Sequence, residues 1–297
     1  MDIKKLKAIC ADIANQLSLK IELESVEPVS GGDINQAFLL KCNFEGEENR
    51  SIFVKINRFD KLDMFVQEKL SLQEIASTQT IAVPNTIALG SVGNEAYFAQ
   101  EYIPMTSSSD VRLFASRLAN LHQHSANAFG FNQNNYIGTT VQKNDWSHSW
   151  PEFFAQSRLQ HQLDLLSKRG VSKRLLQKGR LLVADIDKFF VGHNPTPSLV
   201  HGDLWTGNYS YKPDGTPIIY DPACYYGDHE VDLAMLELFG NPEKLFFETY
   251  AQIFPINKGY SVRKNLYNLY HILNHANLFA GGYISQSETM IDTLMAS

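Results

Sequence analysis

The sequence predicts an α+β protein with two lobes, a small antiparallel sheet followed by a larger, mainly helical part. Three observations lead to this fold class. Short, often alternating runs separated by turn-forming residues dominate residues 21–103. From about residue 110, apolar residues recur at the three- and four-residue steps of helices. The pattern changes around Pro104, so we expect an N-terminal lobe over residues 1–103 and a C-terminal lobe over residues 104–297.

The N-terminal lobe is expected to begin with an amphipathic helix, because apolar residues repeat on one face at Ile3, Leu6, Cys10, Ile13 and Leu17. A strand meander follows, with strand-like runs at residues 21–29, 36–43, 51–57, 86–91 and 96–103. Helical spacing returns once within this meander, at residues 61–77.

The C-terminal lobe opens with a polar cluster, Thr106 to Asp110, that suits a helix cap. Helical patterns then cover residues 110–125, 149–169, 172–191, 242–253 and 260–281. The exception is 198–221, where strand-like pieces near 209–211 and 217–220 flank a turn at Pro213-Asp214-Gly215.

Composition excludes several classes of protein. Apolar residues make up 44% of the chain and charged residues 20%, which excludes wholesale disorder. The net charge is −6 and no Lys/Arg block occurs, which argues against a nucleic-acid partner. No apolar run approaches the roughly 18 residues of a membrane-spanning helix, and charges interrupt the N-terminal segment, unlike a signal peptide. Three scattered cysteines favour a reducing cytoplasm.

The strongest chemical signal is the stretch Val200-His201-Gly202-Asp203-Leu204-Trp205-Thr206-Gly207-Asn208, followed by Asp221. The spacing resembles the H-R-D-L-x-x-x-N loop of protein kinases and their second, metal-binding Asp. Asp203 could orient an acceptor hydroxyl and take its proton, and Asn208 and Asp221 offer the oxygen ligands that Mg²⁺ prefers beside ATP phosphates. The alternative is that both acids are turn or cap residues; His201 is expected only to brace the loop.

A second signal is a lysine inside an apolar strand. Alternation in residues 52–56 places Phe53 and Lys55 on one face of the strand. In helix 61–77, Glu68 falls on an apolar stripe with Phe65, Leu72 and Ile75. Pairing Lys55 with Glu68 would satisfy both charges and match the strand-lysine/helix-glutamate pair of kinases. The alternative is a surface pair on a helix rotated differently.

A glycine pair precedes this strand. Gly31 and Gly32 lie between two predicted strands, where backbone N–H groups can approach phosphate closely. Two glycines in a hairpin are more often a simple turn, and neither common glycine-rich nucleotide motif is present. Because the glycine pair precedes the strand that carries Lys55, we interpret it as a loop that covers the nucleotide.

These residues together resemble the fructosamine kinase (ketosamine-3-kinase) family, which shares a protein-kinase-like fold with aminoglycoside phosphotransferases and choline kinases. The resemblance rests on segments along nearly the whole chain: 31–35, 53–55, Glu68, 101–103, 118–122, 129–131, 135–139, 150–154, 158–159, 201–205 and 226–234. The His201 to Trp205 loop and the 226–234 segment are the more specific to the family. Asp221-Pro222-Ala223 replaces the D-F-G of protein kinases, and no A-P-E segment is seen.

The resemblance implies ATP- and Mg²⁺-dependent phosphorylation of a sugar hydroxyl on a ketosamine, either free or bound to protein. Asp203 would accept the proton, Asn208 and Asp221 would hold Mg²⁺, and Lys55, with Glu68, would contact phosphate. The nucleotide would also meet Gly31 and Gly32, and the backbone of Glu101, Tyr102 and Ile103 would hold the adenine. The acceptor side would include Trp205, Trp150, Arg158 and His229, although helix core is an alternative for Trp150. A monomer is expected.

Two other functions stay open. An aminoglycoside- or choline-type kinase needs acidic residues for a cationic acceptor, and Asp228, Glu230 and Asp232 could supply them. A non-catalytic scaffold would lack equivalents of Lys55, Asp203 or Asp221, and all three are present. Asp232 is also interpreted as a helix N-cap that ties down a loop. His122 is expected either on a helix surface or bracing a loop, and Cys224 is expected to be a small buried hydrophobe.

Overall fold

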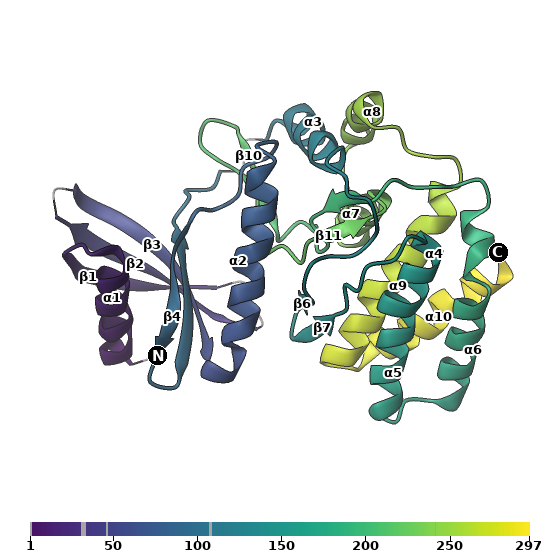
Figure 1. The fold of residues 1–297 in the computed structure, drawn as a ribbon, viewed down its shortest axis with the longest axis horizontal. Helices are drawn as coiled ribbons and strands as arrows, with labels where there is room; N and C mark the ends of the chain where they lie inside the picture. The colour runs from purple at the N-terminus through teal and green to yellow at the C-terminus, as the bar shows by residue number, and fades with distance from the viewer. Residues whose placement is uncertain (1, 31–33, 46, 107–108, 241) are drawn as a thin grey trace.

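The computed structural model describes residues 2–30, 34–45, 47–106, 109–240 and 242–297. It shows a sheet-rich part at one end and a helical part at the other, with helix α2 (Leu62–Ser77) between them (Figure 1). The last strand of the sheet ends at Glu101 and the next helix begins at Val111, so the expected lobe junction falls within this connection. Within the described residues, no helix combines the length and the apolar character needed to cross a membrane.

The N-terminal part is a five-stranded antiparallel sheet in the order β1-β2-β3-β5-β4. Its strands are β1 (Ile21–Val29), β2 (Gln36–Phe44), β3 (Glu47–Arg58), β4 (Thr86–Val92) and β5 (Glu95–Glu101). Helix α1 (Ile3–Leu17) buries Leu6, Ile9, Cys10 and Ile13 against one face of the sheet. Helix α2 packs on the opposite face, where Phe65 and Leu72 meet Phe98. The helices and strands predicted for this lobe are therefore confirmed, to within a few residues at their ends.

The C-terminal part contains most of the helices. They are α3 (Val111–His122), α4 (Trp150–Phe153), a π-helical segment (Phe154–Gln160), α5 (His161–Lys168), α6 (Lys173–Ala184), α7 (Glu230–Leu238), α8 (Lys244–Ile253), α9 (Tyr260–Phe279) and α10 (Gly282–Ala296). Helix α10 was not predicted. The helix predicted over 172–191 ends at Ala184 and continues as a 3-10 turn, Ile186–Phe190.

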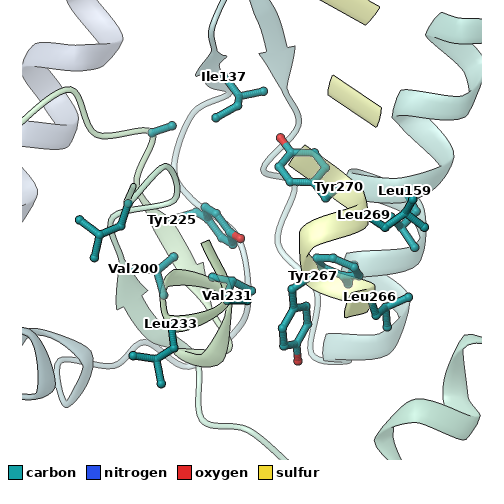
Figure 2. Close-up of a cluster of buried hydrophobic side chains, with 14 of the residues drawn as sticks. Ile137, Leu159, Val200, Tyr225, Val231, Leu233, Leu266, Tyr267, Leu269 and Tyr270 are labelled. Atoms are coloured by element: carbon teal, nitrogen blue, oxygen red, sulfur yellow. The ribbon is translucent and has the colours of Figure 1, made fainter. Parts of the chain in front are cut away.

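Short strand pairs carry the loops of this part. They are β6 (Asn135–Ile137) with β7 (Thr140–Gln142), β8 (Ser198–Val200) with β11 (Tyr225–Gly227), and β9 (Tyr209–Tyr211) with β10 (Pro217–Ile219). Only β9 and β10 were predicted. Figure 2 shows the core beneath them, where Val200 and Tyr225 from the strands and Val231 from α7 lie opposite Leu266 and Tyr270 of α9. The strands β8 and β11 thus pack on a hydrophobic core.

Helix α2 is attached to the C-terminal part as well as to the sheet. Tyr136 of β6 donates a hydrogen bond to Asp63 (2.8 Å), and Gln67 donates to Gln133 (3.0 Å). Further along α2, Tyr226 of β11 donates to Glu74 (2.7 Å). The helix is therefore held along its length by residues of both parts.

Candidate active site

The site is organised around Lys55, which lies between two carboxylates. Its ammonium group is 2.7 Å from Glu68 of α2 and also contacts Asp221, which follows β10. The Lys55 side chain is only 6% exposed, whereas that of Asp221 is 45% exposed. Burial acts to lower the pKa of Lys55, but the two carboxylates outweigh it and raise the pKa above its ordinary value. The predicted pairing of Lys55 with Glu68 is present, and Lys55 is cationic.

Asp203 lies on the loop after β8, 25% exposed, with Asn208 folded back onto it. The Asn208 amide donates to the backbone carbonyl of Asp203 (2.8 Å) and to its carboxylate (3.3 Å). Burial, together with the negative charges of Asp221 and Asp232, raises the pKa of Asp203 to about 7. A carboxylate with such a pKa is suited to exchanging a proton with a hydroxyl near neutral pH.

The backbone of this loop is held by the buried carboxylate of Asp232 in α7. It accepts hydrogen bonds from the backbone N–H groups of His201 (2.7 Å) and Gly202 (2.9 Å), and from the His122 ring (3.1 Å). Burial acts to raise the pKa of Asp232, but these hydrogen bonds hold it below its ordinary value. The expectation that Asp232 ties down a loop is correct. Its interpretation as an N-cap is wrong, because α7 begins two residues earlier, at Glu230.

Two histidines complete the support of the loop. His201 accepts from the backbone N–H of Asp203 (3.2 Å), and its other ring nitrogen lies 2.9 Å from the carbonyl of Tyr220, next to Asp221. His122 also contacts the Tyr250 hydroxyl (2.6 Å). Both histidines are fully buried, and the bracing role expected for His201 is confirmed. Of the two roles left open for His122, the structure shows loop bracing and not a helix surface.

Gly202 allows the loop to approach the segment after Asp221. Its φ is +82°, a left-handed conformation, and a Cβ atom there would lie 2.2 Å from the carbonyl oxygen of Ala223. Gly215 has nearly the same φ, +83°, but a Cβ atom there would meet nothing within 4 Å. Comparing substitutions at the two glycines therefore distinguishes the free-energy cost of the left-handed conformation from the additional cost of the clash with Ala223.

We expect Gly202→Ala to lower the free energy of unfolding by at least about 3 kcal/mol, because the clash adds to the conformational strain. The matched change Gly215→Ala should cost only about 1–2 kcal/mol, which is the strain alone. Urea denaturation of the two variants would measure the difference. Equal losses would show that the loop can move away from Ala223.

The donors around Asp221 suit a hard cation. The Asn208 amide nitrogen is directed at Asp203, which leaves its oxygen as the ligand atom, and Asp221 is a half-exposed carboxylate with only one oxygen engaged by Lys55. Oxygen donors of this kind are those that Mg²⁺ prefers. Asp221 also has φ +58°, a left-handed conformation that is strained for a residue with a side chain.

The acceptor-side residues predicted from the sequence differ in their exposure. Trp205 is partly exposed beside Asp203. Trp150, Arg158 and His229 are buried, with 1%, 0% and 3% of their surface exposed. Trp150 donates to the Tyr267 hydroxyl (3.1 Å), and His229 contacts the Tyr250 hydroxyl (2.9 Å). These three side chains are enclosed in the core of the C-terminal part and offer almost no surface to a bound acceptor.

The structure describes only some of the residues that the sequence predicts to bind the nucleotide. Gly31 and Gly32 lie outside the described residues. Glu101 closes β5 with its backbone N–H bonded to the carbonyl of Asn85 (3.0 Å), and Tyr102 is exposed between the two parts of the molecule. His271 of α9 was not predicted, yet its ring lies 4.0 Å from the Asp203 carboxylate. Its position in a long helix gave no local signal of this proximity.

Fold and site together define a phosphotransferase with a protein-kinase-like fold: a sheet lobe supplies the paired lysine, and a helical lobe supplies the loop with Asp203 and Asn208. The model of the protein family described as fructosamine kinase matches residues 5–297 of this chain. A probable ketoamine kinase of Synechocystis is 41% identical over 288 residues, covering 96% of this chain and 95% of that protein. The chain belongs to the fructosamine kinase family.

Two further proteins extend this comparison. A chloroplastic protein-ribulosamine 3-kinase of Oryza sativa is 36% identical over 275 residues, covering 91% of this chain and 79% of that protein. A solved structure of a candidate fructosamine-3-kinase from Haemophilus somnus has a TM-score of 0.87 at 28% identity and covers 98% of both chains. The likeness therefore extends over both lobes.

Proposed function

We propose that this protein transfers the γ-phosphate of ATP to a sugar hydroxyl of a ketosamine, in a Mg²⁺-dependent reaction. The observation that carries the proposal is the placement of Lys55 between Glu68 and Asp221, beside the loop that holds Asp203 and Asn208. Family membership supports the choice of acceptor. All the residues assigned to the site belong to one chain, so we propose that a monomer is active. We also propose that the reaction takes place in the cytoplasm.

In this proposal some side chains bind ATP and Mg²⁺, and others bind the ketosamine. Lys55 contacts the ATP phosphates, and Glu68 fixes the position of its ammonium group. Asn208 and Asp221 would hold Mg²⁺, which neutralises phosphate charge when bound. Asp203 orients the acceptor hydroxyl and takes its proton. Gly31 and Gly32 would cover the phosphates, and the backbone at Glu101, Tyr102 and Ile103 would hold the adenine.

The acceptor is expected to meet Trp205. Its ring lies 6.2 Å from that of Phe239 in an edge-to-face arrangement, and it also covers Gly207 of its own loop. The ring is thus held in place two residues after Asp203, where it can form an apolar wall. A sugar offers apolar C–H faces to such a wall and polar edges to Asp203.

We therefore expect Trp205→Ala to raise KM for the ketosamine by roughly 10-fold, a loss of about 1.4 kcal/mol in binding, with KM for ATP nearly unchanged. Phe239→Leu, which keeps an apolar side chain behind the ring, is the matched control and should have a smaller effect. Steady-state kinetics with each substrate varied in turn would measure both constants. A larger rise in KM for ATP would contradict the placement of Trp205 at the acceptor.

The structure weakens the alternative of a cationic acceptor. Asp228, Glu230 and Asp232, which kept that alternative open, are all fully buried. Asp228 accepts from Tyr267 (2.5 Å), and Glu230 is bound by Arg263 through both of its oxygens (2.7 and 2.9 Å). Their charges are engaged internally, so they do not line a pocket for an aminoglycoside or choline.

The proposal is tested by following ATP consumption with a panel of acceptors. We expect turnover with ribulosamine and fructosamine derivatives of lysine, both free and within a peptide, and none with kanamycin or choline. Omitting Mg²⁺ should abolish turnover. Activity confined to kanamycin or choline would overturn the acceptor class and leave phosphotransfer intact, whereas no ATP binding at all would favour a scaffold.

A further inference from the structure

The hairpin β6–β7 carries three buried amide side chains that no step of the proposed reaction uses. Asn135 and Gln142 face each other across the strand pair, and Asn144 follows two residues later. All three are at most 2% exposed. Buried amides are costly unless hydrogen-bonded, so their partners indicate what they do.

Two of these amides donate hydrogen bonds to the backbone of the segment that follows Asp221. Gln142 donates to the carbonyl oxygen of Ala223 (2.9 Å), and Asn135 donates to that of Cys224 (2.8 Å). From the other side, the N–H of Ala223 donates to the carbonyl of His201 in the Asp203 loop (3.0 Å). Residues 223–224 are therefore fixed between the hairpin and the loop.

A buried arginine determines which way the amides point. Arg158, in the π-helical segment, donates to the side-chain oxygen of Asn144 (2.8 Å), so the Asn144 nitrogen must face the other way. That nitrogen donates to the Asn135 oxygen (2.9 Å), which also accepts from Gln142 (2.8 Å). An arginine can only donate and a backbone carbonyl can only accept, so every amide between them has one orientation.

The remaining contacts strengthen this arrangement. Tyr270 of α9 donates to the Gln142 oxygen (2.8 Å), which fixes the other end of that amide. The Arg158 guanidinium lies over the ring of Tyr225, 4.0 Å from its centroid, and is fully buried. Its sequence-based assignment to the acceptor is thereby replaced by an internal role.

We propose that the buried hairpin network, comprising Asn135, Gln142, Asn144, Arg158 and Tyr270, positions the Asp221 carboxylate for Mg²⁺ binding. This inference rests on the proposed role of Asp221 as a metal ligand. Asp221 is half exposed and has a strained φ of +58°, so its side chain is placed mainly by its backbone. The network fixes that backbone from two and three residues away, and its members are positioning residues that never touch the substrates.

The test compares nucleotide affinity with and without the metal. Gln142→Met keeps the size of the side chain, adds no charge and removes the hydrogen bonds to Ala223, Asn135 and Tyr270. We expect it to reduce the Mg²⁺-dependent gain in ADP affinity by roughly 10- to 100-fold, the usual range for a residue supporting a metal ligand. Affinity measured by calorimetry in EDTA should be unchanged. The control is Val141→Thr, on the same strand but exposed.

A milder variant covers the case in which Gln142→Met fails to fold. Tyr270→Phe removes a single hydroxyl and should reduce the Mg²⁺-dependent gain by a smaller factor, in the same direction. If affinity fell equally with Mg²⁺ and in EDTA, or if the gain stayed at the wild-type value, the positioning role would be overturned. A wild-type protein that binds Mg·ADP but phosphorylates no ketosamine would overturn the proposed acceptor and leave this role standing.

Discussion

Replacing Asp203 with asparagine is expected to lower kcat by roughly 10²–10⁴-fold, the range for loss of a positioned acid or base. Asparagine keeps the size of the side chain but cannot take the proton of the acceptor hydroxyl. Nucleotide binding should persist, since Lys55, Glu68 and Asp221 make their contacts with one another and do not depend on Asp203. Turnover at saturating substrates and calorimetric binding of ADP would measure the two effects separately.

The matched control for this change is Asp214→Asn. Asp214 lies in an exposed turn, where it accepts a hydrogen bond from the backbone N–H of Thr216 (2.9 Å) and another from the Thr216 side chain. The same chemical replacement there should leave kcat unchanged. Near wild-type turnover of Asp203→Asn would remove Asp203 from its assigned role, whatever the control shows.

Replacing Lys55 with methionine is expected to lower kcat/KM for ATP by roughly 10²–10³-fold, comparable to the removal of one preorganised group that stabilises transition-state charge. The change also leaves Glu68, which is largely buried, without its cationic partner. The loss should therefore be coupled to Glu68. A cycle comprising Lys55→Met, Glu68→Gln and the double variant would measure that coupling from ATP kinetics.

Lys41→Met provides the comparison, because Lys41 also lies in the sheet but forms an exposed pair with Glu27. Exposed pairs contribute little, so this variant should behave as wild type. If the effects of Lys55→Met and Glu68→Gln were simply additive, the two side chains would act independently in spite of their contact.

The sheet lobe could be predicted because its signals are local. Alternation over residues 52–56 has a period of two, and this alone placed Lys55 opposite the apolar face of β3. The stripe on α2 likewise placed Glu68 toward the sheet. Both signals depend on residues close in sequence, and the structure joins them at 2.7 Å.

Other features depend on contacts between distant segments. Strands β6 and β7 have three residues each, too few to establish a period, so the hairpin network could not be foreseen. The sequence also could not show that Trp150 and Arg158 would be enclosed, because an aromatic or basic residue on a helix can face either the core or a ligand. The proximity of His271 to Asp203 depends on how α9 packs as a whole.

The attachment of α2 to both lobes has a consequence for control of the enzyme. Protein kinases are switched on and off by moving the helix that bears the paired glutamate, which makes or breaks the ion pair with the lysine. Here the hydrogen bonds from Tyr136 and Tyr226 of the C-terminal part to α2 oppose such a movement. The Lys55–Glu68 pair is thus held in one arrangement by contacts within the chain, and moving α2 as protein kinases do would first have to break these hydrogen bonds.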